Sequence, residues 1–158
     1  MWDELITQLA DALQTKGWML ATAESCTGGW IAKVCTDMAG SSAWFERGFV
    51  TYSNAAKQDM LDVQAVTLAN NGAVSEAVTA EMAAGALSHS RAQVAVSVSG
   101  IAGPGGGTPT KPVGTVCFGW AMENGTTRTE TCHFDGDREA VRQQSVEHAL
   151  RILLQMTR

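Results

Sequence analysis

The chain has 158 residues, of which 45% are hydrophobic, and a formal net charge of −5. A chain of this length can bury a core within one domain, and its apolar runs are far shorter than the ~20 residues that a membrane-spanning helix needs. The 11 lysines and arginines form no basic run, so nothing indicates a nucleic-acid-binding surface. We therefore expect one domain over residues 1–158, with neither nucleic acid nor membrane as a partner.

The N-terminus and the cysteines indicate a cytoplasmic protein. Residues 1–5 lack the basic and apolar regions of a secretory signal. No CxxC pair is present, so the sequence suggests neither a zinc site nor a disulfide framework. We expect four reduced and mostly buried thiols, which are Cys26, Cys35, Cys117 and Cys132.

The first part of the chain predicts a helix, a strand and a second helix. Apolar residues recur at helical spacing over residues 4–16, after Asp3 as a plausible N-cap. Residues 18–23 are typical of a buried strand. An amphipathic helix that stops at Gly40 follows, so Ser25 is expected at a strand-to-helix turn.

The same alternation continues through the next segment. Residues 49–52 predict a strand, after which Asn54 can cap a helix that holds Lys57 in its first turn. A further short helical stretch is expected to end at residues 71–72, and Ser75 can cap the helix that follows.

The second half of the chain predicts a sheet that is partly antiparallel. Alternating valines predict a strand over residues 94–98, which runs into a glycine-rich loop at residues 100–107. Strands over residues 113–122 and 127–134 flank Asn124-Gly125, a strong hairpin signal. With a last helix that begins near Asp135 or Asp137, the pattern predicts an α/β fold with a mixed sheet.

Ser25 and Lys57 are the first candidates for chemistry. A serine hydroxyl becomes a useful nucleophile when a base takes its proton, and a lysine can be that base if burial or a helix N-terminus lowers its pKa. The N–H groups around Cys26, Thr27 and Gly28 could receive the oxyanion of a tetrahedral intermediate. Tyr52, the only tyrosine, could relay a proton or hold the Lys57 amine. Together these residues suggest amide hydrolysis.

Each candidate also has an ordinary structural interpretation. Taken alone, Ser25 would more often be a helix N-cap, Lys57 a solvated surface residue and Tyr52 a core aromatic residue. Cys26 is an alternative nucleophile that ranks behind Ser25. The three histidines leave a Ser-His-Asp triad open, although nothing favours one; they are His89, His133 and His148.

A loop and two arginines are candidates for binding a substrate. The loop at residues 100–107 follows a strand, as phosphate-binding loops do, but it matches neither the Walker nor the dinucleotide pattern, and a mobile surface loop is nearly as plausible. Arg138 and Arg142 lie one helical turn apart and could hold a phosphate, although pairing with nearby carboxylates is the commoner role.

The combined motifs resemble the CinA C-terminal domain family over nearly the whole chain. The resemblance is carried by TAESCTGGWIAKVCTDMAGSSAWFERGFVTYSNAAKQDML, NNGAVSEAV, VSVSGIAGPGGGTPTKPVGTV and GDREAVRQQSVEHAL. The first block is similar to the stand-alone bacterial nicotinamide-nucleotide amidohydrolases. This resemblance implies a three-layer α/β/α sandwich with a mixed, mostly parallel sheet. It also implies hydrolysis of nicotinamide mononucleotide to nicotinate mononucleotide and ammonia, a salvage step, without metal or other cofactor.

The resemblance also implies roles for particular residues. It implies a catalytic pair of Ser25 and Lys57, with Tyr52 as an auxiliary residue. It places substrate near a set of positions that includes the candidate arginines, namely Gly100, Ile101, Ala102, Gly103, Thr108, Arg138 and Arg142. Competing interpretations are a non-catalytic pyridine-nucleotide-binding or regulatory module and a related amidase with another carboxamide substrate. A homodimer is the statistical default for the oligomeric state.

Overall fold

A five-stranded mixed sheet forms the centre of the molecule, with the strand order β2-β1-β3-β4-β5. The computed structural model describes all 158 residues. β1 pairs in parallel with β2 and β3, whereas β4 is antiparallel to both of its neighbours. The strands are β1 (Leu20–Glu24), β2 (Phe45–Val50), β3 (Val94–Gly100), β4 (Thr115–Met122) and β5 (Thr127–His133).

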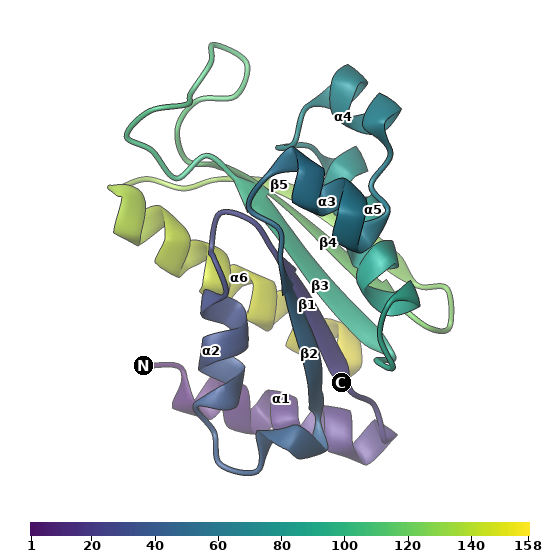
Figure 1. Cartoon of the computed structure of the whole chain (residues 1–158). Coiled ribbons are helices and arrows are strands. Elements are labelled where there is room, and N and C mark those ends of the chain that lie inside the picture. The colour runs from purple at the N-terminus through teal and green to yellow at the C-terminus, as the bar shows by residue number, and fades with distance from the viewer.

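Helices cover both faces of this sheet, which confirms the predicted three-layer α/β/α architecture (Figure 1). One layer contains α1 (Asp3–Lys16), α2 (Trp30–Thr36) and α6 (Arg138–Thr157). The other contains α3 (Asn54–Leu61), α4 (Ala65–Asn71) and α5 (Glu76–Ser88). A short 3₁₀ helix, Ser41–Ala43, precedes β2.

The two faces of the sheet differ in the size of their side chains. Alternation along the strands directs large residues such as Phe118 and Trp120 toward the α1/α6 layer, and Ala21 and Ala95 toward α5. The small face lets α5 approach closely, and Ser97 Oγ donates a 2.6 Å hydrogen bond to the Thr79 carbonyl of that helix.

Several element boundaries differ from the sequence predictions. The strand predicted at residues 49–52 is β2, Phe45–Val50, because β1 supplies pairing partners from Leu20 to Glu24 only. The strand predicted at residues 18–23 is β1, Leu20–Glu24, whose pairing with both β2 and β3 begins at Leu20. The predicted cap Asn54 was also wrong, because Ser53 accepts the N–H of Ala56 at 3.0 Å. In contrast, Asp137 caps the last helix, as one of the two predicted residues.

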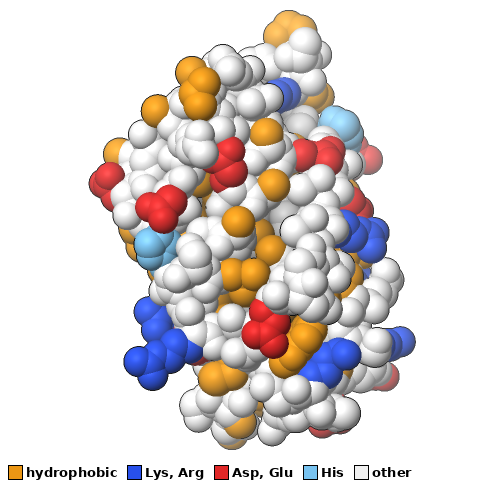
Figure 2. Space-filling model, turned by 90° about the vertical axis from the view of Figure 1, so that its right-hand side faces the viewer, with side chains coloured by type: hydrophobic (Ala, Val, Ile, Leu, Met, Phe, Trp, Pro, Cys, Tyr) orange, Lys and Arg blue, Asp and Glu red, His pale blue; other side chains and the backbone are white.

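On the face of the molecule that Figure 2 shows, acidic and basic side chains are interspersed. Hydrophobic side chains form small patches between them, and no continuous basic region appears on this face (Figure 2). Among the helices, none combines the length and the apolar character that crossing a membrane requires.

Candidate active site

Ser25 follows β1 directly and lies in a tight turn. Its N–H donates to the Val98 carbonyl of β3 at 3.0 Å, and its own carbonyl accepts the N–H of Gly28 at 3.0 Å. Gly28 and Gly29 then adopt φ values of 61° and 102°, a left-handed conformation that glycine adopts readily. The turn separates Ser25 from α2, which begins only at Trp30. Ser25 therefore lies in a strand-to-helix turn, as predicted, but outside the first turn of α2.

The cap of α2 comes from Glu24, a residue that the sequence analysis did not single out. Its carboxylate accepts the N–H groups of Ile31 at 2.8 Å and Ala32 at 3.0 Å, and the Thr27 hydroxyl at 2.6 Å. Burial raises the pKa of Glu24, while these hydrogen bonds oppose that rise. Because Glu24 occupies the helix N-terminus, Ser25 does not act as the cap, and its side chain is available for other contacts.

Lys57 reaches Ser25 from the first turn of α3. Its amine donates to Ser25 Oγ at 2.9 Å and to the Thr51 carbonyl at 3.0 Å. The lysine is 2% exposed and the serine 8% exposed, so both side chains are largely shielded from solvent. The two residues that the sequence nominated for chemistry thus form one buried contact, although 31 residues lie between them in the chain.

Burial sets the protonation properties of this pair and of its neighbour Cys26. It lowers the pKa of Lys57, because an ammonium ion loses hydration in the interior. Burial, followed by the charge of Glu24, raises the pKa of Cys26 to about 12. Cys26 therefore carries a thiol near neutral pH, which makes it a poor nucleophile. None of the three histidines hydrogen-bonds to Ser25, so the structure forms no Ser-His-Asp triad there.

Two backbone N–H groups beside Ser25 have no hydrogen-bond acceptor within the protein. Those of Cys26 and Thr27 donate to no acceptor, whereas the Gly28 N–H is used by the carbonyl of Ser25. Two of the three predicted donors are therefore available, and they belong to a turn rather than to a helix N-terminus.

Arg142 ties the turn after β1 to α6, and Arg138 ties α6 to the glycine-rich loop and to the segment after β2. Arg142 donates to the carbonyls of Cys26 and Thr27, both at 3.1 Å. Arg138 donates to the Gly103 carbonyl at 2.8 Å and to the Tyr52 hydroxyl at 2.9 Å. Tyr52 is 61% exposed and has this arginine, not Lys57, as its hydrogen-bond partner.

The glycine-rich loop lies beside the same turn. At Gly100, a Cβ atom would stand 3.2 Å from Cys26 Sγ and 2.8 Å from Val116, which shows how closely the backbone packs there. Ala102 is buried, and the Ile101 N–H donates to Thr115. Thr108 lies further out, where its hydroxyl accepts the Lys111 N–H at 3.0 Å, and it has no hydrogen bond to the other candidate residues.

An open hollow of about 670 Å³ lies between the turn after β1, from Thr27 onward, and the start of α6. Its lining combines turn backbone with three basic side chains and one acidic side chain, so its net charge is positive. The lining residues are Thr27, Gly28, Gly29, Trp30, Lys33, Arg138, Glu139 and Arg142.

A model of the CinA C-terminal domain matches residues 3–157. The chain belongs to this family. It is 59% identical over 152 residues to nicotinamide-nucleotide amidohydrolase PncC of Escherichia coli K12, covering 96% of this chain and 92% of that protein.

Solved structures of CinA proteins have the same fold. The competence/damage inducible protein CihA from Agrobacterium tumefaciens superposes with a TM-score of 0.95 at 46% identity, over 98% of this chain and 94% of that one. A CinA superfamily protein from Klebsiella pneumoniae 700603 has a TM-score of 0.93 at 44% identity, over 98% and 96% of the two chains.

In this CinA-family chain, the long-range contacts around Ser25 are what the sequence analysis missed. The only local signal for Glu24 was a carboxylate at the end of an apolar strand, directly before the candidate serine. No local signal marks Arg142 as a residue that holds the Cys26-Thr27 backbone, because 115 or more positions separate the partners.

Proposed function

We propose that this chain is a nicotinamide-nucleotide amidohydrolase, which converts nicotinamide mononucleotide and water to nicotinate mononucleotide and ammonia. The name of the E. coli relative, which is 59% identical, supports this substrate. The buried 2.9 Å contact between Lys57 Nζ and Ser25 Oγ carries the mechanism. We further propose that the whole of residues 1–158 forms this one amidohydrolase domain.

In the first half of the reaction, Ser25 Oγ attacks the carboxamide carbon while its proton passes to the neutral amine of Lys57. Burial favours that neutral amine. The carbonyl oxygen becomes an oxyanion, which the free N–H groups of Cys26 and Thr27 are suited to bind. The Lys57 ammonium then protonates the departing nitrogen. Ammonia leaves, and an ester between Ser25 and the nicotinoyl group remains.

In the second half, water hydrolyses this ester. Lys57, neutral again, takes a proton from the water as it attacks the ester carbon, and the same N–H groups bind the second oxyanion. The proton then returns to Ser25 Oγ, and the carboxylic acid product leaves as the carboxylate after it loses its own proton to solvent. Each residue ends as it began, and Lys57 carries every proton exchanged with Ser25, the leaving nitrogen and the attacking water, so we expect no metal or cofactor requirement.

The positive hollow between Thr27 and the start of α6 suits the phosphate of the nucleotide. Arg138, Arg142 and Lys33 line it, and Glu139 is its only acidic lining residue. Arginine donates in a fork that matches phosphate oxygens. The hydrogen bonds of Arg138 to Gly103 and Tyr52 fix its guanidinium at the edge of the hollow. In this proposal Tyr52 positions Arg138, and the loop at residues 100–103 forms the neighbouring wall.

The deciding experiment is ammonia release from nicotinamide mononucleotide by chelator-treated protein. We expect wild-type release without added metal, a loss of roughly 10³-fold or more in Ser25→Ala and Lys57→Met, and much weaker activity on nicotinamide riboside. Ser53→Ala, which removes only the cap of α3, is the matched control because it leaves the Ser25–Lys57 pair in place.

Two other outcomes would replace the proposal. Nucleotide binding without ammonia release would identify a pyridine-nucleotide-binding or regulatory module. Equal hydrolysis of the nucleotide and the riboside would identify an amidase for another carboxamide. A role in pyridine nucleotide salvage, a cytoplasmic location and a homodimer remain predictions that follow from the proposed activity and from general frequencies.

A further inference from the structure

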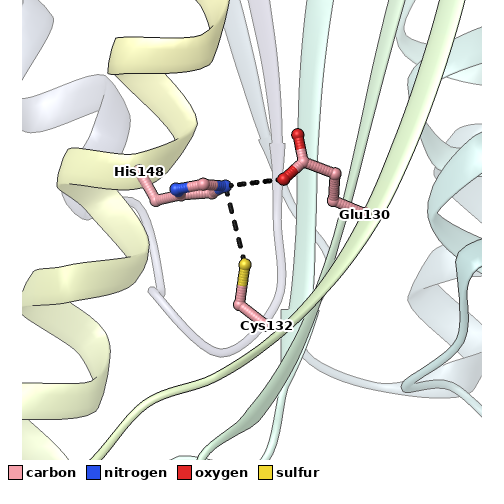
Figure 3. A group of neighbouring side chains, drawn as sticks. All are labelled: Glu130, Cys132 and His148. Carbon is pink, nitrogen blue, oxygen red and sulfur yellow. Dashed lines mark hydrogen bonds and ion pairs between the residues drawn. The ribbon is translucent and has the colours of Figure 1, made fainter.

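Glu130, Cys132 and His148 gather at the far side of the sheet from α5, where β5 packs against α6. Glu130 and Cys132 lie two positions apart on β5 and therefore point to the same face. His148 projects from α6 toward both of them (Figure 3). His148 Nε2 lies 3.2 Å from Glu130 Oε1 and 3.6 Å from Cys132 Sγ, and the three ligand atoms are within 4.8 Å of one another.

These distances match those between ligands that share a tetrahedral zinc ion. With bonds of about 2.0–2.1 Å to nitrogen, about 2.3 Å to sulfur and about 2.0–2.2 Å to oxygen, the nitrogen lies roughly 3.6 Å from the sulfur and roughly 3.4 Å from the oxygen. The observed 3.6 and 3.2 Å are close to these values, and the sulfur and oxygen, which lie within 4.8 Å of each other, would have to come to roughly 3.6 Å. We propose that Glu130, Cys132 and His148 form a Zn²⁺-binding site.

The donor atoms select the metal. Imidazole nitrogen, thiolate sulfur and a carboxylate oxygen suit Zn²⁺, whereas Mg²⁺ and Ca²⁺ take oxygen ligands. The His148 and Glu130 side chains are 26% and 25% exposed, so an ion can enter from solvent and water can supply the fourth ligand. On binding, Zn²⁺ replaces the proton of the Cys132 thiol, which is released to solvent.

Neighbouring side chains hold two of the ligands in place. The His148 ring centroid lies 4.9 Å from that of Phe118, and Trp120 and Phe134 also contact the ring. Arg128 Nη2 lies 2.6 Å from Glu130 Oε2, which leaves Oε1 directed at His148. Such outer contacts orient metal ligands and reduce the reorganisation that binding requires.

The site would join β5 to α6, the helix whose Arg142 holds the backbone next to Ser25. His148 lies six residues, or roughly 9 Å of helix, beyond Arg142 on α6. A bound ion would therefore stabilise the attachment of α6 to the sheet without taking part in hydrolysis. The sequence analysis did not detect the site, because its ligands come from two elements and no CxxC pair marks it.

The test is a Zn²⁺ titration of chelator-treated protein against a chromophoric competitor, with Co²⁺ as a spectroscopic probe. We expect one Zn²⁺ per wild-type chain and a cobalt spectrum with thiolate charge-transfer and tetrahedral bands. Affinity should fall in Cys132→Ser and in His148→Gln by more than the roughly 10- to 100-fold that the loss of an outer contact to a ligand costs. His133→Gln is the matched control, because His133 is the exposed neighbour of Cys132 and should bind Zn²⁺ like wild type.

Melting temperature is the second readout. Zn²⁺ should raise it in wild type and His133→Gln, but not in Cys132→Ser or His148→Gln, and circular dichroism shows whether each variant is folded. No binding in wild type, no cobalt–thiolate band, or equal affinity in all four proteins would overturn the site. Because the titration measures the metal directly, its result does not depend on the proposed hydrolysis.

Discussion

A lysine amine is normally protonated near neutral pH, so its use as a base depends on its surroundings. Around Lys57 the surroundings are an interior in which the side chain is 2% exposed, with a serine hydroxyl and the Thr51 carbonyl as polar contacts. No carboxylate contacts the amine. Burial thus lowers its pKa without an opposing ion pair, which is the condition a lysine base requires.

The pH dependence of hydrolysis should report this lysine. The proposed base must be neutral, so kcat/KM for nicotinamide mononucleotide should rise with pH until Lys57 has lost its proton, and level off below its ordinary pKa of 10.5. Initial rates of ammonia release across pH 6 to 10 provide the measurement. A profile that is flat, or that falls as pH rises, would contradict a lysine base.

Lys57→Met should remove activity without destabilising the fold. The lowered pKa means that Lys57 binds more protons in unfolded than in folded chains between that pKa and 10.5, so the contribution of this residue to stability rises with pH in this window. Methionine removes the desolvated amine, so the stability of the variant relative to wild type should fall as pH rises through the window. Urea unfolding at several alkaline pH values tests the claim. A variant much less stable than wild type at neutral pH would show that the lysine is needed for folding.

Glu24 shows how one carboxylate can organise the turn after the candidate nucleophile. Glu24→Ala leaves the Thr27 hydroxyl and the N–H groups of Ile31 and Ala32 without their acceptor. Each buried unsatisfied group costs about 1–3 kcal/mol. The variant no longer buries a charged carboxylate, which offsets part of this cost. We therefore expect the free energy of unfolding to fall by about 1–3 kcal/mol, and kcat to fall as well. Thermal unfolding beside Glu123→Ala, at an exposed turn, is the comparison; equal stability would refute the capping role.

At the scale of elements, the sequence was most informative where a local pattern determines the structure. Alternating valines predicted β3, and Asn124-Gly125 predicted the β4–β5 hairpin, because strand alternation and turn geometry are local properties. The start of β2 was missed because this edge strand exposes Arg47 and Gly48 to solvent. The contact between Ser25 and Lys57 depends on how α3 packs, which no local pattern specifies; the sequence could only nominate the two residues.

Close packing of α5 against α3 sets the position of Lys57. At Gly85 of α5, a Cβ atom would clash with the Leu61 carbonyl, the last residue of α3. Helix propensity alone would favour alanine by ~1 kcal/mol, but relief of this clash requires backbone movement.

We therefore expect Gly85→Ala to destabilise the protein by about 1–3 kcal/mol. Activity should fall by about 10-fold or more, because α3 carries the proposed base and small misplacements slow catalysis. Urea unfolding and ammonia release measure the two effects, with Ala84→Ser on the exposed side of α5 as the control. If Gly85→Ala were more stable than wild type, α3 and α5 would be able to move apart at little cost, which would contradict this prediction.

At the scale of the whole molecule, α6 connects two regions with different chemistry. Its first turns carry Arg138 and Arg142, which hold the segments around Ser25, and its middle carries His148 beside β5. Both regions depend on the same large core, because Val141, Val146 and Leu150 of α6 are fully buried against the sheet. Substitutions that weaken the packing of α6 against the sheet should therefore affect the candidate active site and the proposed metal site together.

Thiol reactivity offers a readout of how tightly the whole molecule is closed. Cys26, Cys35 and Cys117 are buried and Cys132 is half-buried, and burial raises the pKa of all four thiols. Because the thiolate is the reactive form, native protein at pH 8 should react slowly with a disulfide reagent, while denatured protein should react fast at all four positions. Cys132 should be the first to react in the native state.

Rapid reaction of two or more native thiols would contradict a closed core on both sides of the sheet. If Zn²⁺ slows the reaction of Cys132 alone, the protection links this whole-molecule measurement to the site between β5 and α6.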